Sequence, residues 1–162
     1  MSQDPNYNQL FQHFVQQPLY QMLGYYNMNE VNRNAMNRSG GWFKSGAACK
    51  AGDIMRRRWM LLDFDPKRLS GIPSSDAEHD AALSLGRQAS NWLMQQGMPE
   101  CLMADSGNGC HLLMPVNLDT SKESTDLVKS VLAAMADRFD TEAVTVDKAV
   151  HDLPRIVRLY GS

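Results

Sequence analysis

The sequence has few of the residues that stabilise a secreted fold or hold a structural metal. Its 162 residues include only three cysteines, Cys49, Cys101 and Cys110, and no Cys-x-x-Cys pair. Such an odd and widely spaced set argues against a disulfide framework and a structural zinc site, and it favours a reducing, cytoplasmic compartment. The adjacent pair Cys110-His111 does not change this, because zinc ligands normally come as spaced pairs.

The chain also lacks long apolar runs and an excess of positive charge. No apolar run approaches the roughly 20 residues that cross a bilayer, so we expect no membrane contact. Residues 1–6 carry neither the basic start nor the apolar stretch of a signal peptide. The formal net charge is −2, so any contact with nucleic acid must come from a local basic patch. With 43% hydrophobic residues, the chain is expected to form one globular domain.

What the sequence does contain is an apolar stretch that turns acidic, residues 58–65 (Arg-Trp-Met-Leu-Leu-Asp-Phe-Asp). Side chains alternate along a strand, so Asp63 and Asp65 share one face with Trp59 and Leu61. Two carboxylates at i and i+2 lie about 7 Å apart. Two divalent cations about 3.5–4 Å apart fit in front of such a pair. The alternative is that both carboxylates simply end the strand and face water.

The stretch Arg56-Arg57-Arg58, just before the acidic end of this strand, is the densest positive charge in the chain. It has two possible interpretations, a solvated start of the strand or a contact with phosphate. The sequence alone favours neither of them.

The pattern of the chain predicts a mixed α+β fold with the central order β-α-β-β-α-β. Ser75 and Glu78 form a capping box that begins the first helix, and Gly97 ends it. The Asn-Gly pair in residues 106–109 is typical of a hairpin turn, because it supplies positive φ angles. After residue 97 the other predicted elements are strands over 101–105, 110–116 and 143–146, a helix from Ser121, and an extended segment over 155–160. Before residue 53 we expect helices within 3–17 and 30–37, a strand over 19–26, and a loop over 38–52 anchored by Trp42 and Phe43.

This order is that of the split βαβ, or ferredoxin-like, arrangement. Right-handed crossovers place the third strand between the first and second, and the fourth strand on the other side of the first. We therefore expect Asp63, Asp65, His111 and Asp147 to meet on the open face of an antiparallel sheet, while Cys110 packs on the opposite face.

Such a set of groups suits metal-assisted phosphoryl transfer. Carboxylate oxygens are the ligands that Mg²⁺ and Mn²⁺ prefer, and two such ions activate a hydroxyl and neutralise a leaving pyrophosphate. His111 lies next to the Gly-rich turn 106–109 with its exposed backbone N–H groups, and we expect it to hold a triphosphate there.

Three groups of residues, taken in order, resemble the archaeo-eukaryotic primase superfamily. They are Asp63-Phe64-Asp65-Pro66, Ser106-Gly107-Asn108-Gly109-Cys110-His111, and Val146-Asp147 followed by residues 153–162 (Leu-Pro-Arg-Ile-Val-Arg-Leu-Tyr-Gly-Ser). The most similar kind is the primase-polymerase domain of plasmid and phage replication proteins and of some CRISPR-linked genes. The resemblance extends over residues 20–162 and includes residues 71–78 between the motifs.

The resemblance implies one catalytic domain, in which an N-terminal α/β unit (1–55) joins an RRM-like unit (56–162) with the site between them. It departs from the family at His151-Asp152, where members often have Asn. The implied site residues are Asp63, Asp65 and Asp147 as catalytic ligands of two Mg²⁺ or Mn²⁺ ions, Ser106 and His111 as ligands of the nucleotide phosphates, and Arg155 and Arg158 as basic residues near the nucleotide.

The activity that the resemblance implies is template-dependent nucleotidyl transfer, as a DNA primase, a DNA polymerase or both. Its partners would be a DNA template or primer and NTP or dNTP substrates. Because relatives continue beyond the position of Gly161-Ser162, we expect further domains, a helicase or a C-terminal primase domain, in the same replication protein.

Two alternatives stay open. A non-catalytic nucleic-acid-binding module of a replication initiator would gain nothing from carboxylates that face phosphates. A metal-dependent nuclease or relaxase needs a tyrosine nucleophile or a histidine cluster, and His111 is the one histidine that the sequence places near the acids.

Overall fold

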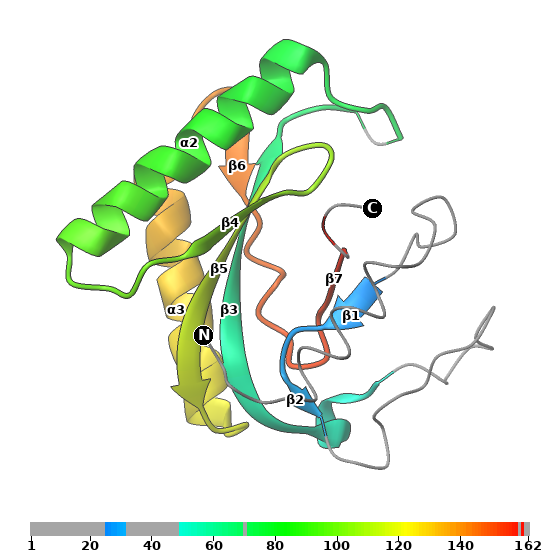
Figure 1. Ribbon diagram of the computed structural model, residues 1–162, viewed down its shortest axis with the longest axis vertical. Coiled ribbons are helices and arrows are strands. Elements are labelled where there is room, and N and C mark those ends of the chain that lie inside the picture. The colour runs from blue at the N-terminus through cyan, green and yellow to red at the C-terminus, as the bar shows by residue number, and fades with distance from the viewer. Residues whose placement is uncertain (1–24, 32–48, 70, 159, 161–162) are drawn as a thin grey trace, which may run out of the picture.

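The computed structural model describes residues 25–31, 49–69, 71–158 and 160 (Figure 1). The predicted helix within 3–17 and the anchor residues Trp42 and Phe43 lie outside this part of the chain, as do most of the predicted strand over 19–26 and the predicted loop over 38–52. The prediction of a helix over 30–37 is wrong at its start, because Glu30 and Val31 form a short strand.

The elements follow the predicted order from residue 54 onward. A long first strand, two helices and three further strands make up the centre of the fold. The full set is β1 (Tyr25–Asn27), β2 (Glu30–Val31), the 3-10 helix η2 (Ala51–Asp53), β3 (Ile54–Pro66), α2 (Asp76–Gln95), β4 (Leu102–Asp105), β5 (Cys110–Leu118), α3 (Lys122–Phe139), β6 (Val144–Val146) and β7 (Ile156–Arg158).

These elements form an α+β fold with an open, curled antiparallel sheet. The strand order is β2-β3-β5-β4, and β6 pairs with the end of β3. The prediction that the third central strand lies between the first and second is therefore confirmed. Helices α2 and α3 cover one face of the sheet, and the two-stranded β1–β7 sheet lies on the other side of β3 (Figure 1). None of the described helices is long and apolar enough to cross a membrane.

The core lies between the helices and the sheet, and β3 separates it from the open face. Met60, Leu62 and Phe64 point toward the helices and are buried, whereas Asp63 and Asp65 point the other way and are half-buried. This confirms the predicted alternation along the central strand. The buried stripes of the two helices pack against the helix-facing side of β3. They are Ala82, Leu85, Gly86, Ala89 and Leu93 on α2 and Val128, Leu132, Met135 and Ala136 on α3.

Helix α2 begins and ends where its sequence predicts. The Ser75 hydroxyl accepts a hydrogen bond from the Glu78 N–H, and the Glu78 carboxylate accepts one from the Ser75 N–H at 2.8 Å. This satisfies two of the donors that a helix leaves open at its N-terminus. Gly97, with a φ of 81°, takes the left-handed conformation just after the helix. The capping box therefore fixes where α2 starts, directly beside the turn at 106–109.

Gly86 lets α2 lie close to β5. A Cβ atom at this position would be 2.3 Å from the Cys110 sulfur and 3.1 Å from the Cys110 Cβ. Cys110 itself is fully buried, as predicted for a side chain that packs on the helix face. The distance between α2 and the strand that carries His111 therefore depends on a glycine in the helix.

We predict that Gly86→Ala destabilises the protein although alanine favours helices. The clash costs about 1–3 kcal/mol, which exceeds the gain in helix propensity of about 1 kcal/mol. Chemical denaturation measures the difference, and Gly52→Ala is a control, since a Cβ there meets no atom within 4 Å. In a Cys110→Ala background the same substitution should cost less, because the sulfur is gone. An equal cost in both backgrounds would contradict the close contact.

Candidate active site

Three functional side chains lie next to one another across the sheet because of strand register. Asp63 on β3 pairs with His111 on β5, and Phe64 pairs with Val146 on β6. The Asp147 N–H then donates to the Asp63 carbonyl oxygen at 2.9 Å. Residues directly opposite each other in an antiparallel sheet project from the same face. The structure therefore brings the side chains of Asp63, His111 and Asp147 to one open face.

Asp65 lies at the end of the same face, one step farther along β3. It pairs with Thr145 on β6. On the other side, Gly109 lies next to Cys110, the residue on β5 that pairs with Phe64. A Cβ on Gly109 would be 2.2 Å from the Phe64 carbonyl oxygen and 3.3 Å from Asp65 Oδ1. A glycine is required here by this close approach. The positive φ in this turn, 93°, belongs to Gly107, so Gly109 does not supply the positive φ predicted for it. The predicted hairpin at this turn is confirmed by the antiparallel pairing of β4 with β5.

The carboxylates repel one another in a partly buried setting. Burial raises the pKa of Asp65, and the charges of Asp63 and Asp147 raise it further, while Arg68 and His111 oppose them. Asp63 Oδ1 is buried and makes no hydrogen bond, although it forms an ion-pair contact with His111 Nε2 at 3.3 Å. A bound cation would offset the repulsion between the carboxylates and would give Asp63 Oδ1 a direct partner.

The donor set fits a magnesium-type ion and does not fit a zinc-type ion. In the described part of the chain, no group of three or more His, Cys, Asp or Glu side chains is spaced to hold a metal by itself. Mg²⁺ is usually bound by one or two carboxylates and completes its shell with water and substrate phosphates. Asp63, Asp65 and Asp147 are therefore residues that could hold such an ion together with a phosphorylated substrate.

His111 is held at both ring nitrogens. Nδ1 is 2.7 Å from the Tyr160 hydroxyl, Nε2 faces Asp63, and the rings of His111 and Tyr160 meet edge to face at 5.7 Å. The histidine is 9% exposed. Tyr160 was not predicted as a site residue, and no local sequence signal identifies it, because its contact spans 49 positions. The orientation of His111 thus depends on the last described residue.

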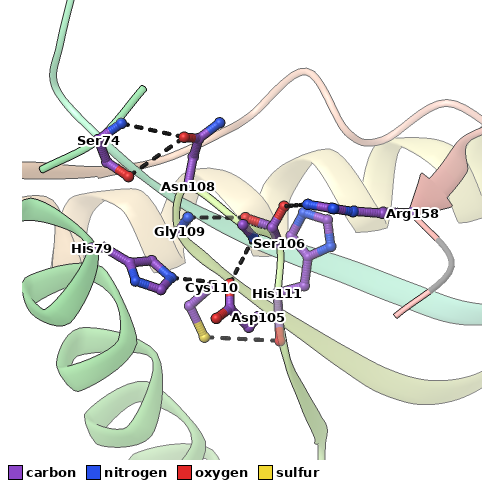
Figure 2. Close-up of polar contacts among 10 residues, drawn as sticks. Ser74, His79, Asp105, Ser106, Asn108, Gly109, Cys110, His111 and Arg158 are labelled. Atoms are coloured by element: carbon purple, nitrogen blue, oxygen red, sulfur yellow. Dashed lines mark hydrogen bonds and ion pairs between the residues drawn. The ribbon is translucent and has the colours of Figure 1, made fainter. Parts of the chain in front are cut away.

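The turn from Ser106 to Gly109 satisfies most of its own backbone donors (Figure 2). The N–H groups of Ser106, Gly107 and Gly109 donate to the Gly109 carbonyl at 3.1 Å, to Asp105 Oδ1 at 2.6 Å and to Ser106 Oγ at 3.0 Å. These three N–H groups, which the sequence predicts to be exposed, already donate within the protein. Any contact of this turn with a phosphate group would therefore be made mainly by side chains.

Three other elements hold this turn in place (Figure 2). The Asn108 side chain accepts hydrogen bonds from the N–H and hydroxyl of Ser74, which precedes α2. His79 on α2 binds Asp105 at 2.9 Å. Arg158 at the end of β7 donates from Nη1 to the Ser106 carbonyl at 3.1 Å. These contacts hold the turn in place and keep Ser106 and Arg158 near His111.

The remaining basic residues predicted from sequence go elsewhere. Arg155 donates to Asp152 at 2.7 Å and to the Ala149 carbonyl at 2.9 Å, within the segment that follows Asp147. Arg56 and Arg58 both bind Asn117 Oδ1. Neither group of contacts involves the turn at 106–109.

Arg57 fits neither interpretation of the arginine triplet, because it is fully buried. Its Nη2 donates to the His151 carbonyl oxygen at 2.7 Å, while Nε and Nη1 are buried without a hydrogen-bond partner. Burial lowers the pKa of Arg57, and the charge of Asp152 acts against this. Arg57 therefore fastens the segment after Asp147 to the central strand.

Comparison of the chain with protein-family models, with curated proteins and with solved structures finds no match. The assignment of a function therefore depends on the residues of the site and on their geometry.

Proposed function

We propose that this chain is a template-dependent nucleotidyltransferase that joins nucleotides on DNA with the help of two divalent cations, as a primase, a polymerase or both. The observation that carries the proposal is the position of Asp63 between His111 and Asp147, with a buried Oδ1 that makes no hydrogen bond and lies 3.3 Å from His111 Nε2. The proposal also rests on the resemblance to the archaeo-eukaryotic primase superfamily, which implies an RRM-like unit and a replication context for such a set of residues.

The proposed roles follow from the positions of the side chains. Asp63, Asp65 and Asp147 would hold Mg²⁺ or Mn²⁺, which when bound lowers the pKa of an attacking hydroxyl and offsets the charge of a leaving pyrophosphate. The side chains of Arg158 and Ser106 are tied to the turn that precedes His111, and all three are proposed to donate to a triphosphate. Because the turn is already fixed, Arg158 and Ser106 need little reorganisation when a nucleotide binds, whereas His111 would exchange its contact with Tyr160 or Asp63 for one with a phosphate.

One observation favours a second candidate, a nuclease that cleaves DNA. The Tyr160 hydroxyl lies 2.7 Å from His111 Nδ1 and thus close to the acidic face, as a tyrosine nucleophile with a histidine base would. Incubation with a template, labelled nucleotides and Mn²⁺ separates the candidates. Extension of a strand supports the first, and a cleaved strand attached to the protein, lost in Tyr160→Phe, supports the second.

We predict that Asp63→Asn and Asp147→Asn each reduce nucleotide incorporation at least about 100-fold, because each removes a charge that would hold the cations. Primer extension with Mn²⁺ measures the rate, and circular dichroism checks the fold. Asp137→Asn, on the exposed side of α3, is the matched control and should keep the parental rate. Incorporation at the parental rate by either site variant would contradict the proposal.

A second prediction concerns stability without cations. Because the pKa of Asp65 is raised, the carboxylate destabilises the fold above that pKa, and Asp65→Asn should raise the Tm at pH 7 by about 1–3 °C. The gain should vanish at acid pH, where the parental carboxyl is protonated. Mn²⁺ should raise the Tm of the parental protein more than that of the variant. A lower Tm for Asp65→Asn at pH 7 would show that the carboxylates do not repel one another.

A third prediction separates His111 from the cation ligands. His111→Ala should weaken nucleotide affinity about 10-fold or more, since a hydrogen bond to a charged phosphate is lost. Cation affinity should change by less than about 3-fold, because the carboxylates remain. Calorimetric titration measures both, with His151→Ala as a control whose ring binds only the Lys148 carbonyl in the described part of the chain. Unchanged nucleotide affinity would remove His111 from the binding site.

A further inference from the structure

A carboxylate lies directly beneath the proposed phosphate-binding turn. Asp105, the last residue of β4, accepts the Gly107 N–H at 2.6 Å and His79 Nε2 at 2.9 Å through the same oxygen, Oδ1 (Figure 2). Burial raises the pKa of Asp105, but the hydrogen bonds from Gly107 and His79 and the charges of His79 and Arg158 outweigh this and lower it. An ionised carboxylate only accepts hydrogen bonds, so His79 Nε2 must carry the proton.

The turn depends on this carboxylate for its shape, yet the charge of the carboxylate weakens the binding of a phosphate group. The hydrogen bond from Gly107 places the turn in its observed shape, with Gly107 at a φ of 93°. A negative charge at the same point repels any polyphosphate that approaches Ser106 and His111, and water screens part of this repulsion because the Asp105 side chain is half exposed. A positive or donating group on the far side of Asp105 would remove this conflict.

His79 is placed to do so. It projects from the second turn of α2 and reaches Asp105 from the helix side, whereas Arg158 reaches the turn from β7 (Figure 2). A purely stabilising role explains the pair poorly. The His79 and Asp105 side chains are 25% and 54% exposed, and ion pairs with such exposure add little to the stability of a fold.

We propose that His79 is a positioning residue for nucleotide binding: its Nε2–H group offsets the charge of Asp105, so that the turn at 106–109 keeps its shape and still accepts an anionic triphosphate. This inference rests on the proposed function and adds a residue to it that touches neither cation nor nucleotide. It places control of phosphate affinity in α2, on the face of the sheet opposite the acidic site.

The test is a rescue. In Asp105→Asn the side-chain oxygen still accepts the Gly107 N–H, but the charge is gone. We expect His79→Ala to weaken the affinity for a deoxynucleoside triphosphate with Mn²⁺ about 3- to 10-fold. The double variant His79→Ala/Asp105→Asn should return to within about twofold of the parental affinity. Mn²⁺ affinity and the Tm should change little, and Asp80→Asn, exposed on α2, is the control for a lost surface charge.

Each outcome decides the inference. If the double variant binds the nucleotide as weakly as His79→Ala does, the His79–Asp105 pair only stabilises the structure, and the inference is overturned. Parental affinity in His79→Ala overturns it as well, and the proposed function is untouched. A parental protein that binds no nucleotide overturns the proposed function together with this inference. If His79→Ala does not fold, His79→Gln keeps a donor toward Asp105 and should bind the nucleotide within about 3-fold of the parental protein, and a larger loss overturns the inference.

Discussion

The register between β3 and its two neighbours is the constraint on which the site depends. Phe64 pairs with Cys110 and with Val146, and all three side chains are buried beneath the helices. A slip of one residue would turn this apolar row outward and bury the acidic row in its place. The core on one face therefore sets the positions of Asp63, His111 and Asp147 on the other.

The site gathers groups that the fold would be more stable without. Asp63 Oδ1 is buried and makes no hydrogen bond, although His111 Nε2 lies 3.3 Å away, and Arg57 has two buried nitrogens without a hydrogen-bond partner. Among the described strands, none lies beside the middle of β3 between β2 and β6, and side chains cover this edge instead. Asn29 accepts the N–H of Arg58 at 3.0 Å and donates to Leu153, while Arg57 donates to His151. These contacts fasten the segment after Asp147, so the position of that carboxylate depends on buried polar groups that replace a strand.

Local patterns predicted the elements and their order, because capping boxes, alternation and turn residues act over a few positions. The alternation also carried an unused signal, since Arg57 shares the face of Trp59 and Asp63, where the segment after Asp147 covers it. The sequence Asp-Ser-Gly at 105–107 likewise predicts a side chain that accepts an N–H two residues on. Tyr160 could not be found in this way. Its contact with His111 joins distant segments, and only the packed chain brings them together.

The part of the candidate site around His111 is completed by strands from opposite ends of the described chain. Arg158 and Tyr160 lie on or just after β7, whose only strand partner among the described elements is β1, with Tyr25 opposite Arg158. A two-stranded sheet is marginal by itself, so β7 is held by this pairing and by the buried Val157. Asp63, Asp65 and Asp147, in contrast, depend on the central sheet. The proposed cation ligands and the proposed nucleotide contacts therefore rest on different strand pairings, and loss of β1 should disturb Arg158 and Tyr160 before Asp63 and Asp65.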